Sequence, residues 1–142
     1  MVVVAVSGGF DPIHVGHVRL FKAAKALGDE LVIIMNNDVW LAAKKGKSFM
    51  PEDERKEIIE SLECVDKVLI THHKEGFTDR SVAAELRELK PDVFANGGDR
   101  APDLDDVPTP EYDVCRALGI KMVWGVGGNK VQSSSWLTAS KK

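Results

Sequence analysis

Residues 1–17 read MVVVAVSGGFDPIHVGH and combine a β-branched run, a glycine pair and two histidines three residues apart. The run at 2–6 predicts a buried parallel strand, because such strands are apolar without alternation. From 15 to 27 apolar residues recur every three or four positions, which predicts an amphipathic helix. A strand that leads through glycines into a helix is the opening of an α/β domain.

The rest of the chain repeats this alternation. We predict strands at 30–35, 65–70, 92–95 and 120–124, helices at 51–62, 78–89 and 111–118, and a short last helix from 133. Residues 39–50 carry three lysines without a clear period and are predicted to be a loop. The pattern indicates one α/β domain, 1–142, with a parallel sheet and right-handed crossovers. Ligands then bind beyond the carboxyl ends of the strands, at 7–17, 36–47, 71–77, 96–100 and 125–135.

Composition narrows the class of protein. The 142 residues are 44% hydrophobic and 29% charged with a net charge of −3, so neither a nucleic-acid partner nor an anionic membrane is indicated. No stretch is long enough to span a membrane, and the N-terminus lacks the pattern of a signal peptide. Cys64 and Cys115 form no CxxC pair. We therefore expect a cytoplasmic protein with two free thiols.

The histidine pair suggests phosphate chemistry. His14 and His17 lie one turn apart and share a face of the helix start, with Gly16 between them. A helix N-terminus offers unpaired N–H groups and partial positive charge, and imidazoles can donate to phosphate oxygens. The sequence contains neither a GxxxxGK[ST] loop nor a GxGxxG turn after the first strand. A different type of nucleotide site is therefore predicted.

The stretch GGFDPIHVGH resembles the start of the cytidylyltransferase-like branch of the HxGH nucleotidyltransferase superfamily. PEDERKEIIESLECVD resembles the second helix of that family, NGGD at 96–99 its GGD turn, and SSS at 133–135 its STT or STS motif. The resemblance covers nearly the whole chain. It implies a Rossmann-like domain with a five-stranded parallel sheet in the order 3-2-1-4-5 and helices on both faces.

The resemblance also implies the site residues. His14 and His17, with Lys44 and Lys47, would be catalytic and stabilise the reacting phosphates. The implied nucleotide-binding residues are Gly9, Phe10, Asp11, Gly16, Lys45, Arg55, Gly97, Gly98, Asp99, Ser133, Ser134 and Ser135. No protein metal ligands are implied, because Mg²⁺ would be held mainly by phosphates and water. Taken alone, the lysines also fit a solvated loop and Arg55 a surface ion pair with Glu52.

The implied activity is transfer of a nucleoside monophosphate from ATP or CTP to a small phosphorylated acceptor, with release of pyrophosphate. Glycerol-phosphate cytidylyltransferases carry an arginine five residues before their last motif, where this chain has Gly128. Sugar-phosphate (heptose) adenylyltransferases lack it and have a GGD turn. ATP and a sugar phosphate are therefore slightly preferred, before CTP with a polyol phosphate and before an FAD synthase using a flavin phosphate.

The pair His72 and His73 and the acidic residues of loop 99–113 (Asp103, Asp105, Asp106) either face the acceptor or are solvated. Relatives suggest a homodimer. Two other classes stay open: a non-catalytic nucleotide sensor on the same fold, and an NAD(P)-linked oxidoreductase. Pyrophosphate release would exclude the first, and failure to bind NAD(P) the second.

Overall fold

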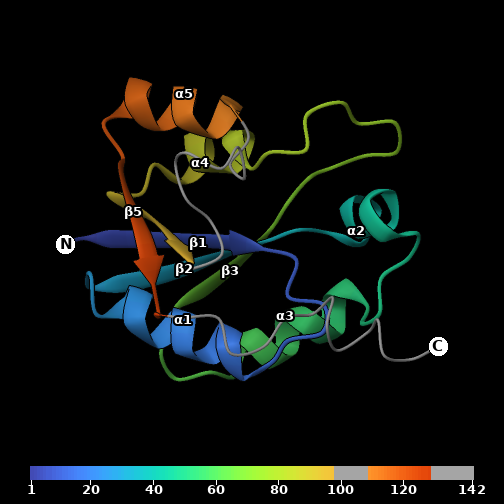
Figure 1. The fold of residues 1–142 in the computed structure, drawn as a ribbon, viewed down its shortest axis with the longest axis horizontal. Coiled ribbons are helices and arrows are strands. Elements are labelled where there is room, and N and C mark those ends of the chain that lie inside the picture. Colours follow the sequence, from blue (N-terminus) through green and yellow to red (C-terminus); the bar gives the residue numbers. More distant parts are fainter. Residues whose placement is uncertain (98–108, 129–142) are drawn as a thin grey trace.

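The computed structural model describes residues 1–97 and 109–128. Its elements alternate along the chain (Figure 1). They are β1 (Val3–Gly8), α1 (Val15–Lys25), β2 (Glu30–Met35), α2 (Asp38–Lys45), α3 (Glu52–Glu60), β3 (Lys67–Ile70), α4 (Ala83–Leu89), β4 (Val93–Gly97), α5 (Thr109–Leu118) and β5 (Lys121–Val126). The last predicted helix lies outside the described residues.

The five strands form one parallel sheet in the order β3-β2-β1-β4-β5, as predicted. The strand order reverses between β1 and β4, so the chain leaves these two strands toward opposite faces. β1 pairs with β2 from Val3↔Glu30 to Gly8↔Met35. This register brings the turn after β1 beside the residues that follow β2, which is where α/β sheets bind ligands.

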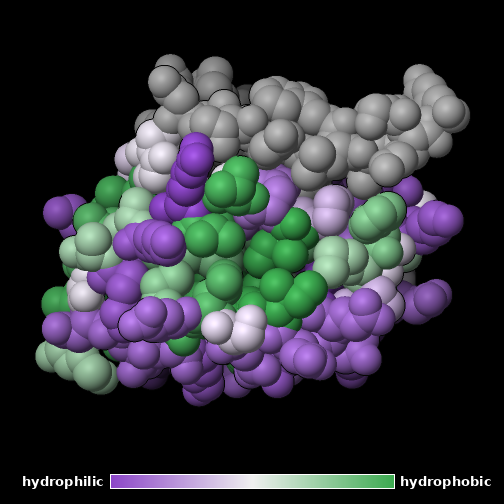
Figure 2. Space-filling view, turned by 90° about the horizontal axis from the view of Figure 1, so that it is seen from below, coloured by the Kyte–Doolittle hydropathy of each residue, from purple (hydrophilic) through white to green (hydrophobic). Residues whose placement is uncertain are grey.

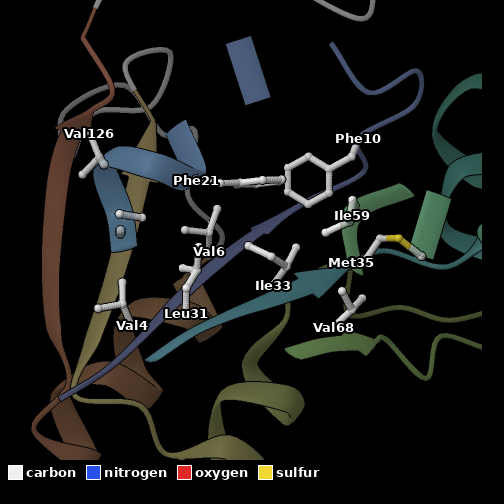
Figure 3. Close-up of a cluster of buried hydrophobic side chains, with 12 residues drawn as sticks. Val4, Val6, Phe10, Phe21, Leu31, Ile33, Met35, Ile59, Val68 and Val126 are labelled. Carbon is white, nitrogen blue, oxygen red and sulfur yellow. The ribbon is translucent and has the colours of Figure 1, made fainter. Parts of the chain in front are cut away.

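Helices α1 and α3 cover one face of the sheet, and α4 and α5 cover the other (Figure 1). Alternate side chains of β2 enter different cores: Leu31, Ile33 and Met35 pack with α1 and α3, and Ile34 packs with α4 and α5. Figure 3 shows the first core, where Phe10 lies near Phe21. Burial on both faces explains why the central strands are continuous apolar runs.

The predicted loop at 39–50 is wrong, because its first half forms α2. Asn37 caps this helix, its Oδ1 accepting a hydrogen bond from the Trp40 N–H at 3.0 Å, and Gly46 ends it with a φ of 92°. Of the helix residues only Leu41 is buried. A helix with one buried side chain has almost no apolar periodicity. Its capping residues, Asn37 and Gly46, are nevertheless of the types that typically begin and end helices.

Other boundaries differ by a few residues. The helix predicted from 78 begins at Ala83, and the strand predicted from 65 begins at Lys67. In α3, Ile58 is 38% exposed while Ile59 is fully buried. Adjacent residues of a helix point about 100° apart, so only one of this pair can face the sheet.

On the side of α1 and α3, apolar side chains gather within a mostly hydrophilic surface (Figure 2). Val15 of α1 and Ile58 of α3 are exposed apolar residues of these two helices. Single exposed apolar residues are common on soluble proteins. Within residues 1–97 and 109–128, no helix is long and apolar enough to cross a bilayer.

Candidate active site

His14 and His17 form a reciprocal cap at the start of α1. The Gly16 N–H donates to Nδ1 of His14 at 3.1 Å, and the His14 N–H donates to Nδ1 of His17 at 3.2 Å. An imidazole nitrogen that accepts a hydrogen bond carries no proton, so both neutral rings are protonated at Nε2. The rings stack with centroids 3.8 Å apart and an interplanar angle of 22°. The pair therefore presents two Nε2–H donors side by side.

Phe10 supports His17 from behind. Its ring is buried and meets the His17 ring edge-on at 4.9 Å and the Phe21 ring at 5.1 Å. The backbone of Phe10 has a φ of 52°, unusual for a bulky residue, which this packing holds in place. A Cβ on Gly8 would lie 2.9 Å from the Phe10 ring, so Gly8 must lack one. Phe10, which was predicted to bind nucleotide, packs against His17 and Phe21 in this structure.

Asp11 holds the segment that follows α2. Its buried carboxylate accepts hydrogen bonds from the N–H groups of Phe49 and Met50 and pairs with Lys45 Nζ at 2.9 Å. The same Nζ donates to the Asp11 carbonyl at 2.7 Å. Asp11 and Lys45 were expected to contact nucleotide, but here their charged groups bind each other. They fix the lysine-bearing segment beside the histidine turn.

Arg55 has different partners from those expected. Its side chain is fully buried, so it does not form a surface ion pair with Glu52. The guanidinium donates to the carbonyl oxygens of Met50, Gly9 and Asn36 and to the Asp38 carboxylate, at 2.7–2.9 Å. Arg55 thus ties together the ends of β1 and β2, the segment after α2 and the start of α2.

The other described site residues lie around this network. The Lys44 Nζ stands 5.0 Å from the centroid of the Trp40 ring, and Lys47 is exposed just beyond α2. Gly9 packs against α2, since a Cβ there would lie 3.0 Å from Leu41 Cδ2. Gly97 ends β4. Gly98, Asp99, Ser133–Ser135 and the acidic residues of loop 99–113 are outside the described residues.

Comparison of the sequence with known proteins identifies the family of this chain. Residues 5–131 match the family model "Cytidylyltransferase-like". The chain belongs to the cytidylyltransferase-like family. It is 39% identical over 105 residues to an FAD synthase of Pyrococcus horikoshii, covering 73% of this chain and 68% of that protein. It is also 40% identical over 101 residues to the bifunctional protein HldE of Streptomyces coelicolor, covering 70% of this chain and 20% of HldE.

A solved structure agrees with this assignment. The lipopolysaccharide core biosynthesis protein of Thermoplasma volcanium matches with a TM-score of 0.70 and 25% identity, over 92% of this chain and 99% of that one. The relatives are nucleotidyltransferases, and the chain is therefore an enzyme of that class.

The segment after β3 is tied to α2 of this nucleotidyltransferase by residues that the sequence analysis did not single out. The Asn37 N–H donates to Thr71 Oγ1 at 3.0 Å, and its side-chain amide donates to the carbonyls of Thr71 and His73. The Trp40 indole N–H donates to the Arg80 carbonyl at 2.8 Å. Asn37 follows a strand end and precedes a helix, a signal that could have identified its capping role.

The two other histidines differ from each other. His72 is exposed, with Nε2 3.8 Å from the Glu88 carboxylate. His73 Nδ1 lies 2.9 Å from Thr71 Oγ1, and its Nε2 lies 3.1 Å from the Asp79 carbonyl. A carbonyl only accepts, so Nε2 carries the proton and Nδ1 accepts from the Thr71 hydroxyl. His73 therefore shapes the segment after β3, and neither histidine is placed against the HxGH pair by a described contact.

Burial keeps the His17 ring neutral. Loss of solvation, with a smaller effect of neighbouring His14, lowers the pKa of His17 to about 3. The ring is therefore uncharged throughout the neutral range and acts as a hydrogen-bond donor. A preformed neutral donor suits a group whose negative charge grows only in the transition state.

The depressed pKa of His17 predicts a pH-dependent stability. The unfolded chain gains a proton near pH 6.5 and the folded ring only near pH 3, so stability is full above pH 6.5 and falls as the pH drops toward 3. Each pH unit in this window costs about 1.4 kcal/mol. Urea unfolding at pH 7.5 and 5.0 should show a loss of roughly 2 kcal/mol that is absent in His17→Asn. An equal loss in both proteins would contradict this assignment.

Proposed function

We propose that this nucleotidyltransferase transfers the adenylyl group of ATP to the phosphate of a small phosphorylated acceptor. The acceptor oxygen bonds to the α-phosphorus, the bond to the β-phosphate breaks, and pyrophosphate leaves. The attacking phosphate is already ionised, so alignment and charge stabilisation suffice without a general base. The observation that carries the proposal is the stacked His14–His17 pair, neutral and protonated at Nε2.

Each group has a role in this reaction. The two Nε2–H donors would bind the α-phosphoryl oxygens, whose charge increases in the transition state. Lys44 and Lys47, at the end of α2 and just beyond it, would bind the β- and γ-phosphates. Asp11, Lys45 and Arg55 would act through position, because their contacts hold that segment against the histidine turn. Ser133–Ser135 and Gly97–Asp99 keep their proposed roles in nucleotide binding.

Among the described residues no cluster of three or more His, Cys, Asp or Glu side chains could hold a metal ion. The Asp11 carboxylate is already occupied by Lys45 and two backbone N–H groups. We therefore propose that Mg²⁺ arrives with the triphosphate, where it neutralises phosphate charge. A homodimer and a cytoplasmic location remain predictions.

The relatives narrow the acceptor. FAD contains an adenylyl group joined to a flavin phosphate, so the name of the FAD synthases implies adenylyl transfer. This chain covers 63–75% of four such proteins but 20% of the matched HldE proteins. FMN is therefore the first acceptor to test, ahead of the sugar phosphate that the motifs favoured. The similarity to HldE and to the lipopolysaccharide core protein makes a sugar phosphate the second acceptor to test.

Pyrophosphate release tests the proposal. ATP and CTP are each supplied with FMN, a sugar 1-phosphate or glycerol 3-phosphate. We expect release with ATP and at least one of the first two acceptors. Release with CTP and glycerol 3-phosphate alone would favour the cytidylyltransferase. Nucleotide binding without release from any mixture would favour a sensor, and binding of NAD(P) without ATP would favour an oxidoreductase.

A further inference from the structure

Asn36 carries an unsatisfied buried oxygen. It is the first residue after β2 and is 5% exposed, yet its side-chain Oδ1 has no hydrogen-bond partner within the described part of the chain. Other buried polar side chains of this region are bonded: Thr71, Asn37 and Asn96 all have partners. An unpaired buried carbonyl costs free energy, so it is rare in a folded protein without a reason.

The position of Asn36 is fixed. Its backbone N–H donates to the Gly8 carbonyl at 2.9 Å, and its own carbonyl accepts from Arg55 Nη1 at 2.7 Å. Arg55 Nη1 also donates to the Gly9 carbonyl, so Arg55 links Asn36 to the turn that carries the histidines. The amide itself can still turn, because the terminal torsion of asparagine is soft. A ligand group that enters beside it can thus be met by side-chain rotation alone.

The strand alternation gives the direction of the side chain. Ile34 of β2 and Ala5 of β1 belong to the core under α4 and α5, so Asn36 and Ser7, two residues further along, fall on the same face. The neighbouring chain here is Gly8 and Gly9, and the Gly8 carbonyl accepts the hydrogen bond from the Asn36 N–H. The first turn of α4 reaches the same edge with buried Glu85, which accepts the His72 N–H.

The chemistry of these groups selects their ligand. A carbonyl oxygen and a carboxylate accept hydrogen bonds, and so does an ionised phosphate. An ionised phosphate offers no donor to the orphan oxygen, whereas a hydroxyl or an N–H group does. β4 and β5 lie on the other side of β1, whereas Asn36 precedes Asn37, which is bonded to Thr71 after β3. The donor thus belongs to the body of the acceptor.

From these contacts we infer that Asn36 is a specificity-determining residue that binds an O–H or N–H donor on the non-phosphate part of the acceptor. The inference rests on the proposed nucleotidyl transfer. It explains the orphan oxygen as a group whose partner arrives with the substrate. The unpaired Oδ1 destabilises the free enzyme. A substrate with a donor satisfies this oxygen and a substrate without one does not, so the enzyme selects the first.

Asn36→Leu introduces an apolar side chain of similar size. It separates the effect of Asn36 on stability from its effect on acceptor binding. In the free enzyme it should raise the thermal midpoint by a few degrees, because it removes an unpaired polar group. In turnover it should raise the KM for FMN or the sugar 1-phosphate roughly tenfold while the KM for ATP stays within about twofold. Asn96→Leu is the matched control for stability. Its amide donates to the Phe94 and Val123 carbonyls, so its midpoint should fall.

The outcomes separate this inference from the proposed function. If the wild type releases pyrophosphate and Asn36→Leu keeps its acceptor KM, the inference is wrong and nucleotidyl transfer stands. A rise in the KM for ATP instead would place the donor on the nucleotide and overturn it. Titration calorimetry with FMN and the sugar 1-phosphate measures binding without catalysis. Equal affinity of wild type and variant, or no binding by the wild type, would also count against it.

Discussion

Replacing His14 or His17 by asparagine is expected to lower kcat about 100- to 1,000-fold while the enzyme stays folded. The Oδ1 of asparagine can take the place of Nδ1 and keep the cap of α1, for which asparagine is well suited. It cannot replace the Nε2–H donor. Removal of one donor to a developing oxyanion costs about 3–4 kcal/mol of transition-state stabilisation. Steady-state pyrophosphate release and thermal unfolding measure the two effects.

Glutamine at the same positions is the matched control. Its amide nitrogen lies near the place of Nε2, so it keeps a donor but loses the Nδ1 acceptor. His14→Gln should therefore retain more activity than His14→Asn while losing about 1 kcal/mol of stability with the cap. The affinity for ATP, measured by calorimetry, should change little in any of these variants. Near-normal kcat in either asparagine variant would refute the assigned role.

Most of the strands and the helix start that carries the histidine pair could be predicted from local patterns, whereas the strand order was implied by the family resemblance. Apolar runs define β1 and β2, and an HxGH turn after the first strand is a short, specific motif. The cap that fixes the tautomers could not be predicted. It depends on which ring nitrogen meets which backbone N–H, and histidine is not a usual capping residue.

The roles of the charged residues were less predictable for a different reason. Asp11, Lys45 and Arg55 are as charged in sequence as any phosphate ligand. Only the fold shows that the Asp11 carboxylate reaches residues almost forty positions away and that Arg55 is enclosed by three carbonyls. The same holds for α2, where a single buried leucine left no periodic signal. Long-range contacts, rather than local propensity, decided each of these cases.

Arg55→Met is expected to cost about 3–5 kcal/mol of the free energy of unfolding, a large fraction of the stability of a domain this size. Methionine fills much of the same volume but leaves the carbonyls of Met50, Gly9 and Asn36 without a donor in a buried site. An unpaired buried acceptor costs about 1–3 kcal/mol, more than the net gain of an ordinary hydrogen bond. Urea unfolding at pH 7.5 measures the loss.

Lys56→Met, one residue along α3, is the matched control. Lys56 pairs with Glu60 at 3.4 Å, both side chains are well exposed, and such pairs contribute little. Its unfolding free energy should change by less than about 1 kcal/mol. The comparison also decides between two roles for Arg55. A variant that unfolds like the wild type but has a raised KM for ATP would make Arg55 a phosphate ligand, whereas loss of stability with near-normal KM at low temperature would make it the residue that joins the strand ends.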